Sequence, residues 1–368
     1  TKFKEYDFYV RPLCSSGLTA EWSNVVTIMT EAPYWTDIVT TKPDGYVEDS
    51  LGNIYISSAE GLAWFSRLSQ SSDLNHKSFT NRKTFLTADV NLGQYKWKPV
   101  KYYNGIFDGQ GYTIDSMFCI LDWADCGLFG WIIHGTVKNV NIHDCYVVGT
   151  TVGGVAGRIS GDTIMNCMVS GTLKGLGSIM GGIVGDADEN ATICIVNSSS
   201  NCLYIDQSQN SFFHIGGIAG KGPTARVGNL VIRNCYASGF IRKRSHSTLW
   251  DGGILSYGEY TTIENCYANH TINANKLYTL RYSEALDNDW FSNTDSGYYI
   301  DNPILFDPDS VSYTKLIEVM NAGVRKYNID GLRLWIEDTA FVNDGLPLLG
   351  SYYETPCRNI SGLQAKNI

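Results

Sequence analysis

The sequence has little charge and little proline for its length. Only 18% of its 368 residues are charged and 9 are proline, whereas about 25% of residues are charged in ordinary globular proteins. No apolar run approaches the ~18 residues of a membrane-spanning helix, and residues 1–5 do not begin a secretory signal peptide. The net charge of −9 argues against a partner bound through nucleic-acid phosphates. We therefore expect no nucleic-acid partner and no membrane insertion in this segment.

The spacings typical of metal and redox sites are also absent. The chain has 10 cysteines and 6 histidines, but it has no C-x-x-C pair and no histidine spacing that suits a metal. At this length a hydrophobic core forms without disulfide staples. We therefore predict no metal and no cofactor.

Glycine, by contrast, is abundant, with 37 residues, and it marks an internal repeat. A phrase of small and apolar residues, Gly-Gly-Ile-Val-Gly in one copy, recurs at 126–130, 153–157, 181–185, 216–220 and 252–256. A second phrase, typified by Ile-Glu-Asn-Cys-Tyr, follows at 141–146, 163–168, 195–199, 231–236 and 262–267. Successive Gly-Gly pairs from residue 153 onwards are 28, 35 and 36 residues apart, and such a period indicates a solenoid or an array.

The contents of the repeat predict the kind of solenoid. Each unit holds two or three runs of 4–6 apolar residues, rich in β-branched side chains and bounded by Gly, Asn and Asp, which are strand signals. A propeller blade needs four strands and about 40 residues, which is more than the unit offers. We predict an all-β fold for residues 84–275, a right-handed parallel β-helix whose like positions stack ~4.8 Å apart.

The second phrase assigns a role to each of its positions. The first position is expected to face the core in every copy: Ile142, Ile164, Ile195, Ile232 and Ile263. The third is expected to form an Asn ladder at a bend: Asp144, Asn166, Asn197, Asn234 and Asn265. The fourth is expected to be buried, mostly as free thiols: Cys145, Cys167, Ser198, Cys235 and Cys266. His143 is then a solvent-facing filler beside a ladder residue, so we predict no catalytic triad here.

The tyrosines that follow the buried cysteines predict a candidate binding surface. Tyr146, Tyr236 and Tyr267 should face outwards and stack in one column, interrupted by Met168 and Ser199. Exposed aromatic rings on a flat sheet form a platform for sugar rings or peptide. The alternative is cross-strand stacking that only stabilises the sheet, and the sequence leaves both open.

A second candidate lies outside the repeat. Residues 287–299 are rich in aromatic rings and oxygen ligands, and their candidate ligand-binding residues are Trp290, Tyr298 and Tyr299. The segment suits a glycan or Ca²⁺, although its spacing does not match the calcium-loop pattern. The alternative is an ordinary solvated loop, and a solvated turn is also our interpretation of the basic cluster at 242–244.

The segments around the repeat divide the chain further. Residues 1–31 predict a hairpin-like strand pair that closes a β-sandwich, and residues 351–368 predict the first strand of another. Residues 32–83 form a linker and an N-terminal cap with a helix over 56–66, because solenoid ends need covering. Residues 276–350 form a C-terminal loop and cap, in which a helix over 312–321 covers the far end and the turn at 343–349 leads out of the domain. We therefore expect a segment of a longer multidomain protein.

The Gly-Gly-Ile-Val-Gly and Asn-Cys-Tyr-Ala phrases, with residues 88–92, 105–114 and 343–347, resemble the GLUG motif of bacterial surface proteins. The resemblance covers roughly residues 53–350, although Ser256, Asn269 and His270 depart from it in the last repeat. It implies a β-helix in secreted or surface-anchored proteins of gut-type Bacteroidetes, among them adhesins and stalks beside peptidase domains, and it supplies no catalytic residues. Residues 1–31 and 351–368 resemble the end and the start of fibronectin type III modules.

Two functions suit a chain of this design. The first is a non-catalytic surface or secreted module, an adhesin or spacer at the cell exterior, whose partner is a host glycan or an extracellular protein. The second is a carbohydrate-active β-helix enzyme, a polysaccharide lyase or glycosidase, which needs carboxylates clustered on one exposed sheet. The repeat places one acid–base combination, Glu264 and Arg233, on adjacent coils. The sequence therefore favours the non-catalytic module, and a cleft with paired carboxylates would favour the enzyme.

Overall fold

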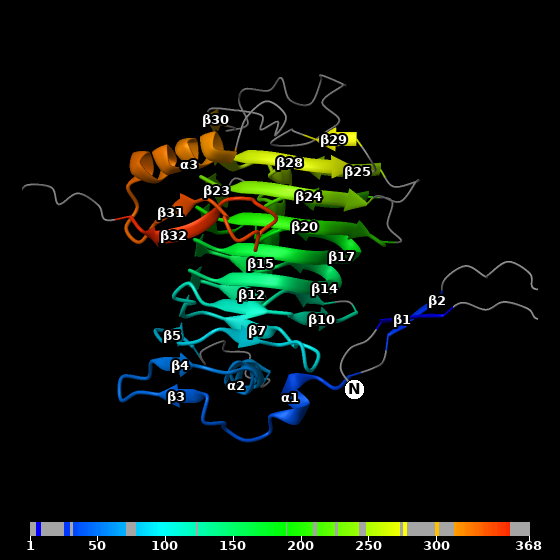
Figure 1. Ribbon diagram of the computed structural model, residues 1–368, viewed down its shortest axis with the longest axis vertical. Helices are drawn as coiled ribbons and strands as arrows, with labels where there is room; N and C mark the ends of the chain where they lie inside the picture. Colours follow the sequence, from blue (N-terminus) through cyan, green and yellow to red (C-terminus); the bar gives the residue numbers. More distant parts are fainter. Residues whose placement is uncertain are drawn as a thin grey trace, which may run out of the picture.

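The computed structural model describes residues 5–8, 26–29, 32–70, 79–122, 124–188, 190–208, 212–224, 227–242, 248–272, 275–277, 299–301 and 313–353. Most of them form one elongated solenoid (Figure 1). Its walls are three sheets of almost entirely parallel strands, and each complete turn of the chain passes through all three. This architecture confirms the predicted all-β parallel β-helix with a few short helices.

The three walls differ in the number of strands that each contains. The six-stranded sheet consists of β7 (Val100–Tyr103), β12 (Phe129–Ile133), β15 (Ala156–Ser160), β18 (Val184–Ala187), β22 (Ala219–Lys221) and β26 (Leu255–Tyr257). The ten-stranded sheet consists of β3 (Tyr46–Glu48), β4 (Ile54–Ile56), β5 (Lys83–Leu86), β8 (Ile106–Asp108), β13 (Thr136–Lys138), β16 (Asp162–Met165), β19 (Thr192–Val196), β23 (Asn229–Arg233), β27 (Thr261–Glu264) and β30 (Tyr299–Asp301).

The twelve-stranded sheet holds the longest strands. It consists of β6 (Val90–Asn91), β9 (Thr113–Asp115), β10 (Phe118–Ile120), β11 (Asp125–Cys126), β14 (Asn141–Gly153), β17 (Met168–Gly181), β20 (Ser199–Asp206), β21 (Phe212–Gly216), β24 (Tyr236–Arg242), β25 (Thr248–Gly252), β28 (Tyr267–Ile272) and β29 (Asn275–Leu277). Its strands alternate between core-facing and outward-facing side chains, so its outer face is one of the main surfaces of the molecule.

The repeated Gly-Gly phrase is the corner where the chain leaves the twelve-stranded sheet and enters the six-stranded one. Gly181 ends β17, and β18 begins at Val184. A Cβ atom on Gly182 would lie only 2.1 Å from the carbonyl oxygen of Gly217 in the next turn. Glycine recurs here because successive turns bring their backbones into direct contact.

The stacked apolar column of the core is confirmed, with one correction. Strand register aligns Val137, Ile164, Ile195, Ile232 and Ile263, all at most 2% exposed. The prediction placed Ile142 first in this column, but Ile142 lies on β14 and pairs with Ile114 and Val169 in the twelve-stranded sheet. The first copy of the second phrase is therefore residues 136–141.

The Asn ladder has the same correction. Its members are Asn139, Asn166, Asn197, Asn234 and Asn265, whose backbones all have φ between 49° and 56°. Each Nδ2 donates to the Oδ1 of the preceding member, over 2.6–2.8 Å. Asp144, which was predicted to be the first member, is exposed at a bulge of β14 and takes no part.

The cysteines that follow the ladder residues are buried as predicted. Cys167, Cys235 and Cys266 are fully buried, and Ser198 occupies the same position in its turn. Cys145 is also buried, but it pairs with Gly171 in another column. All eight cysteines in the described part of the chain are free thiols, whereas Cys14 and Cys357 lie outside it.

Two short helices and a strand pair stand at the first turn of the solenoid: α1 (Trp35–Ile38), α2 (Ala59–Ser69) and the antiparallel β3–β4. The Ser58 hydroxyl accepts a hydrogen bond from the Gly61 amide over 3.2 Å and so caps α2. Leu62 and Phe65 are fully buried, and the Phe65 ring lies 4.6 Å from that of Phe79. The predicted helix in this segment is confirmed.

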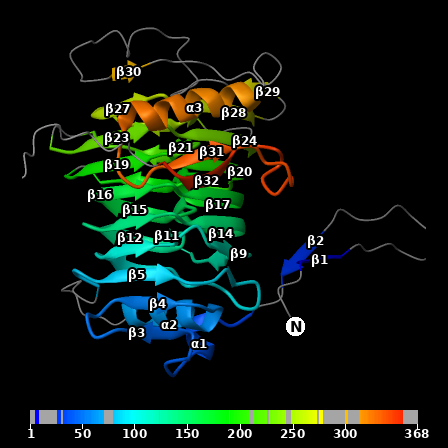
Figure 2. The ribbon, with the colours of Figure 1, turned by 60° about the vertical axis from the view of Figure 1, so that its left-hand side comes forward.

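The C-terminal strap, defined as residues 313–353, contains the helix predicted over 312–321 but does not lie where it was predicted. It consists of α3 (Tyr313–Tyr327), β31 (Arg333–Ile336) and β32 (Leu348–Tyr352), the last two paired antiparallel. The α3 backbone accepts a hydrogen bond from Asn265, and Gly323 abuts Asn234 and Asn265. The strap therefore lies along the side of the later turns (Figure 2); it neither covers the open end nor leads away from the domain.

Two further observations complete the fold. β1 (Glu5–Phe8) pairs antiparallel with β2 (Val26–Met29), as the hairpin-like prediction required; most of the remainder of 1–31 and of 351–368 lies outside the described residues. Among the described residues, none of the helices combines the length and apolarity needed to cross a bilayer.

Candidate functional site

A row of polar side chains crosses the outer face of the twelve-stranded sheet. We call the following residues the polar row: Asn91, Asp115, His143, Ser170, Asn201 and Ser238. Strand register places consecutive members side by side on β6, β9, β14, β17, β20 and β24. At the step from His143 to Ser170 the register shifts, because β14 bulges between Ile142 and Cys145. The row therefore brings together residues that are far apart in the sequence.

The polar row is held by its own hydrogen bonds. The Asp115 carboxylate accepts from Asn91 Nδ2 over 2.7 Å and lies 2.8 Å from His143 Nδ1. Asn201 Nδ2 donates to Asp344 of the strap over 3.0 Å, and the Ser238 hydroxyl donates to Asn201 Oδ1 over 3.2 Å. The side chains of His143 and Asp115 are 51% and 33% exposed, so these groups are ordered yet open to a ligand.

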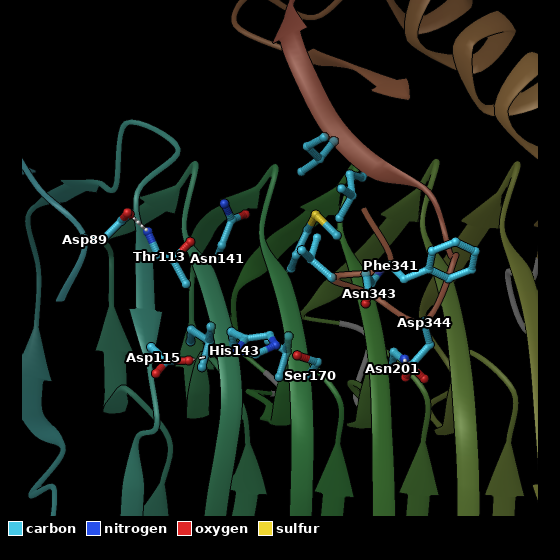
Figure 3. Close-up of a pocket in the computed structure, with 16 residues that line it drawn as sticks. Asp89, Thr113, Asp115, Asn141, His143, Ser170, Asn201, Phe341, Asn343 and Asp344 are labelled. Atoms are coloured by element: carbon cyan, nitrogen blue, oxygen red, sulfur yellow. Dashed lines mark hydrogen bonds and ion pairs between the residues drawn. The ribbon is translucent and has the colours of Figure 1, made fainter. Parts of the chain in front are cut away.

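A groove of about 790 Å³ lies between the polar row and the strap. Figure 3 shows Asp115, His143 and Ser170 on its floor, with Phe341 and Asp344 of the strap at its other side. Met168, Val169, Leu348 and Leu349 add apolar surface. The groove therefore combines hydrogen-bonding groups with apolar contacts.

The strap turn that forms the rim of the groove is fixed from within. The Asp338 carboxylate accepts hydrogen bonds from the amides of Val342, Asn343 and Gly345 over 3.0, 2.7 and 3.1 Å. This network holds Phe341 at a φ of 55°, a conformation that a bulky side chain rarely adopts. The Phe341 side chain is nonetheless 77% exposed.

Two of the predicted platform residues are buried beneath the strap. Tyr236 and Tyr267 align on β24 and β28, as predicted, but they are only 2% and 1% exposed. The Tyr236 hydroxyl donates to the Pro347 carbonyl over 2.6 Å, and its ring packs 5.2 Å from that of Trp335. The prediction that these rings are exposed is wrong, because the strap returns to cover them.

Tyr146 belongs to a different column. It pairs with Phe118 and Thr172, and its ring stacks on Phe118 with centroids 5.0 Å apart and planes 10° apart. Strand register extends this column to later turns. Its side chains point away from the core, next to the polar row on the same face. We call these half-buried residues the aromatic row: Phe118, Tyr146, Thr172, Leu203 and Phe240.

The other predicted ligand-binding residues are described only in part. Trp290 and Tyr298 lie outside the described residues, as does most of the basic cluster at 242–244. Tyr299 begins β30 and pairs with Thr262 in the ten-stranded sheet. Trp290, Tyr298 and Tyr299 thus remain predicted binding residues.

The carboxylates of the groove each have a separate partner. Asp89 accepts a hydrogen bond from the Thr113 amide over 2.8 Å. Asp115 is hydrogen-bonded within the polar row, and Asp344 accepts from Asn201. Glu264 and Arg233 form an ion pair on the ten-stranded sheet, where the Arg233 guanidinium lies 5.5 Å from the ring of Tyr327. In the described part of the chain, no three His, Cys, Asp or Glu residues are arranged to hold a metal ion.

The sequence contained one signal for the strap that the prediction did not use. Leu316, Met320 and Val324 follow one another at a spacing of four residues and are buried against the wall in the structure. Such a stripe requires an apolar partner surface. In the structure, that surface is the column that contains Tyr236 and Tyr267. The polar row carries no such signal, because its members are unevenly spaced in the sequence.

Comparison with known proteins agrees with this architecture. Residues 148–174 match the GLUG motif. The matched stretch runs from β14 through β15 and β16 into β17, which is one turn of the solenoid. The GLUG turn also contributes Ser170 to the polar row.

No curated protein matches the chain. Among solved structures, the chain is similar to one described as "a putative immunoglobulin A1 protease from Bacteroides ovatus". The two share 17% sequence identity with a TM-score of 0.51, over 82% of this chain and 93% of the other. At this identity the similarity concerns the fold alone.

Proposed function

We propose that the chain is a non-catalytic binding module of the bacterial cell exterior and that it holds a glycan in the groove beside the polar row. The observation that carries the proposal is the exposed Phe341 ring facing a row of ordered carboxylate, imidazole and amide groups across a groove of about 790 Å³. Sugars present hydroxyl groups around the ring and an apolar face, so they suit a surface that offers both chemistries.

The conformation of Phe341 supports a binding role. A bulky residue at positive φ is strained, and such strain persists only where the surrounding structure enforces it. Here three amide hydrogen bonds to Asp338 enforce it. The strained turn places a large apolar ring in solvent at the rim, where it contributes nothing to the core. A ligand that stacks on the ring would account for the arrangement.

The location at the cell exterior rests on resemblance. The match of residues 148–174 to the GLUG motif supports this location, because the repeat resembles that of bacterial surface proteins. The buried free thiols are compatible with that place, because burial protects them from oxidation.

A glycan-array screen of the whole chain tests the proposal. Phe341→Ala and His143→Ala should each weaken binding of the selected glycan about tenfold, the loss expected for one central aromatic or hydrogen-bonding contact. Leu51→Ala is the matched control, because Leu51 is 85% exposed and distant in the fold. If no glycan binds, or if both groove variants bind as tightly as the wild type, the proposal fails.

The second candidate is a glycan-cleaving enzyme, and the observation that favours it is the presence of Asp89, Asp115 and Asp344 in one groove. Incubation of the bound glycan with the protein separates the two functions. A binding module leaves the glycan intact. Shorter products that disappear in the Asp115→Asn variant would assign the groove to catalysis and overturn the non-catalytic proposal.

A further inference from the structure

A second cavity lies on the six-stranded sheet, away from the strap. It has a volume of about 530 Å³ and opens where β7, β12 and β15 meet the ends of β11 and β14. We call the following residues the corner site: Lys98, Lys101, Tyr102, Trp131, Thr150 and Arg158. All of them line this cavity.

Two aromatic rings and an arginine lie in register at the corner site. Trp131 pairs with Tyr102 on one side and with Arg158 on the other. The Tyr102 and Trp131 ring centroids are 6.1 Å apart, and the Arg158 guanidinium lies 5.3 Å from the Trp131 ring. Neighbouring half-exposed rings on successive strands offer a continuous apolar contact about the length of a sugar unit or two.

The corner site is positively charged on a chain whose net charge is −9. Its lining contains Lys98, Lys101 and Arg158 against one acid, Asp125. Arg158 is balanced by Asp125 at 3.8 Å and Asp186 at 3.5 Å. Within the described residues neither lysine forms an ion pair; Lys101 Nζ lies 5.3 Å from the Tyr102 ring, and Lys98 Nζ lies 5.0 Å from the ring of Tyr34. Both ammonium groups are therefore available to an anion.

Two buried polar atoms at the corner site have no partner in the described part of the protein. They are Trp131 Nε1 on β12 and the Thr150 hydroxyl on β14. A buried donor without a hydrogen bond is destabilising. The two residues belong to different sheets and both line the cavity, so one ligand can approach both.

We propose that the corner site binds an acidic sugar residue, with its carboxylate or sulfate group held by Lys98 and Lys101 and its ring stacked on Tyr102 and Trp131. Trp131 Nε1 and the Thr150 hydroxyl then bond to ring substituents. This inference rests on the proposed glycan-binding function and specifies the ligand class. β14 connects the two sites, because it carries His143 near one end and Thr150 near the other. Tyr146, which stacks on Phe118 of β10, lies between them on β14.

Calorimetric titration with three oligosaccharides of equal length tests the inference: an oligomer of galacturonic acid, a sulfated oligosaccharide and an uncharged cello-oligosaccharide. The full chain should bind at least one acidic probe about tenfold more tightly than the neutral one at about 0.1 M salt, and the advantage should shrink at about 1 M, where charges are screened. The two acidic probes distinguish the carboxylate from the sulfate.

Three variants address the individual contacts. Lys98→Gln and Lys101→Gln should each reduce acidic binding about fivefold and flatten its salt dependence, without affecting the neutral probe. Trp131→Phe keeps an aromatic ring but removes the N–H, so binding should weaken about fivefold while the unfolding transition is retained. Lys83→Gln, an exposed lysine on the ten-stranded sheet, is the matched control.

The outcomes separate this inference from the proposed function. If neutral and acidic probes bind equally, and the lysine variants change neither, the corner site is not an acidic-sugar site although the groove proposal stands. If acidic binding falls in Phe341→Ala but not in the corner variants, the anion is held in the groove and the inference is overturned. If no probe and no arrayed glycan binds, both proposals fail.

Discussion

At the scale of single residues, the core of the solenoid contains an ionisable ring. His270 lies on β28 with its side chain fully buried, and Nε2 hydrogen bonds to the Gly253 carbonyl over 3.1 Å. Burial lowers the pKa of His270 to about 4, because the imidazolium form loses its hydration there. The ring edge approaches Tyr204, with centroids 5.5 Å apart. The folded protein therefore keeps this histidine neutral under conditions in which an exposed histidine is protonated.

This residue predicts acid sensitivity. Above pH ~6.5 the ring is neutral in both the folded and the unfolded chain, so it adds no pH dependence. As the pH falls from ~6.5 towards 4, the unfolded chain binds a proton that the folded one excludes, so the free energy of unfolding decreases by up to about 3 kcal/mol. Chemical denaturation at a series of pH values measures this slope.

The His270→Gln variant isolates the contribution, because glutamine donates to the Gly253 carbonyl without titrating. The variant should lose a clear part of the slope between pH 6.5 and 4. The remainder includes His214, whose pKa burial also lowers to about 4. His134→Gln, at an exposed position, serves as the control. A His270→Gln slope equal to that of the wild type would refute the assignment.

At the scale of elements, one tryptophan of the strap combines an apolar contact with a hydrogen bond to the wall. Trp335 is 1% exposed, packs against Tyr236, and donates from Nε1 to the Oδ1 of Asn197 over 2.7 Å. Leu316, Met320 and Leu349 surround the same cluster. The strap thus attaches to a ladder residue of the wall as well as to its apolar surface. Both contacts help to hold the rim of the groove in place.

Trp335→Ala should lower the free energy of unfolding by about 3–5 kcal/mol, the usual loss for a large buried aromatic ring. Trp335→Phe retains most of the apolar contact and should cost only about 1 kcal/mol through the lost hydrogen bond. Denaturant unfolding gives both values, and proteolysis within the strap should accelerate in the alanine variant. A loss below about 1 kcal/mol for alanine would contradict the docking described here.

Most of the Asn ladder could be predicted from the sequence alone. The ladder at Asn166, Asn197, Asn234 and Asn265 was readable because every copy has an isoleucine two residues before the asparagine and a cysteine or serine directly after it. The first copy was misplaced because Asp144, at a bulge, has a φ of 48° and is followed by Cys-Tyr, so it imitates the local pattern of a ladder residue. The true member, Asn139, has a φ of 56° but lacks the Cys-Tyr sequence.

Most of the candidate site could not be predicted from the sequence, for a physical reason. The polar row depends on which residues strand register brings together, and each turn has a different length. The burial of Tyr236 and Tyr267 depends on the strap, which is about 50 or more residues away in the sequence. Local periodicity does not predict which distant segments contact one another. Tertiary packing decided both, whereas the strands and core columns followed from local patterns.

At the scale of the whole molecule, contacts run mainly between adjacent turns. Each inner strand of the six-stranded sheet pairs with the preceding and the following turn, and the walls share one continuous apolar core. Stability in such a structure is approximately a sum of contacts between neighbours. The middle turns are supported on both sides, and the outer turns on one.

Hydrogen exchange should therefore be graded along the axis. Amides of β15 and β18, in the middle of the six-stranded sheet, should exchange most slowly, and those of the terminal strand β26 faster. Exchange followed by mass spectrometry measures the gradient. Gly182→Ala, which places a Cβ 2.1 Å from the Gly217 carbonyl oxygen, should raise exchange locally in the two turns it separates. Uniform protection in the wild type would contradict this nearest-neighbour description.

The side-chain hydrogen bonds of the Asn ladder all point the same way along the wall. Every amide donates towards the N-terminal turns, so the aligned dipoles present N–H groups at one pole and an oxygen at the other. Asp108 accepts from Asn139 over 2.9 Å at the first pole, and the Tyr267 hydroxyl donates to Asn265 over 2.7 Å at the second. Asp108 and Tyr267 are thus terminators of a polar chain. During evolution, turns inserted or deleted between them leave every amide satisfied, whereas growth beyond either one requires a new terminator.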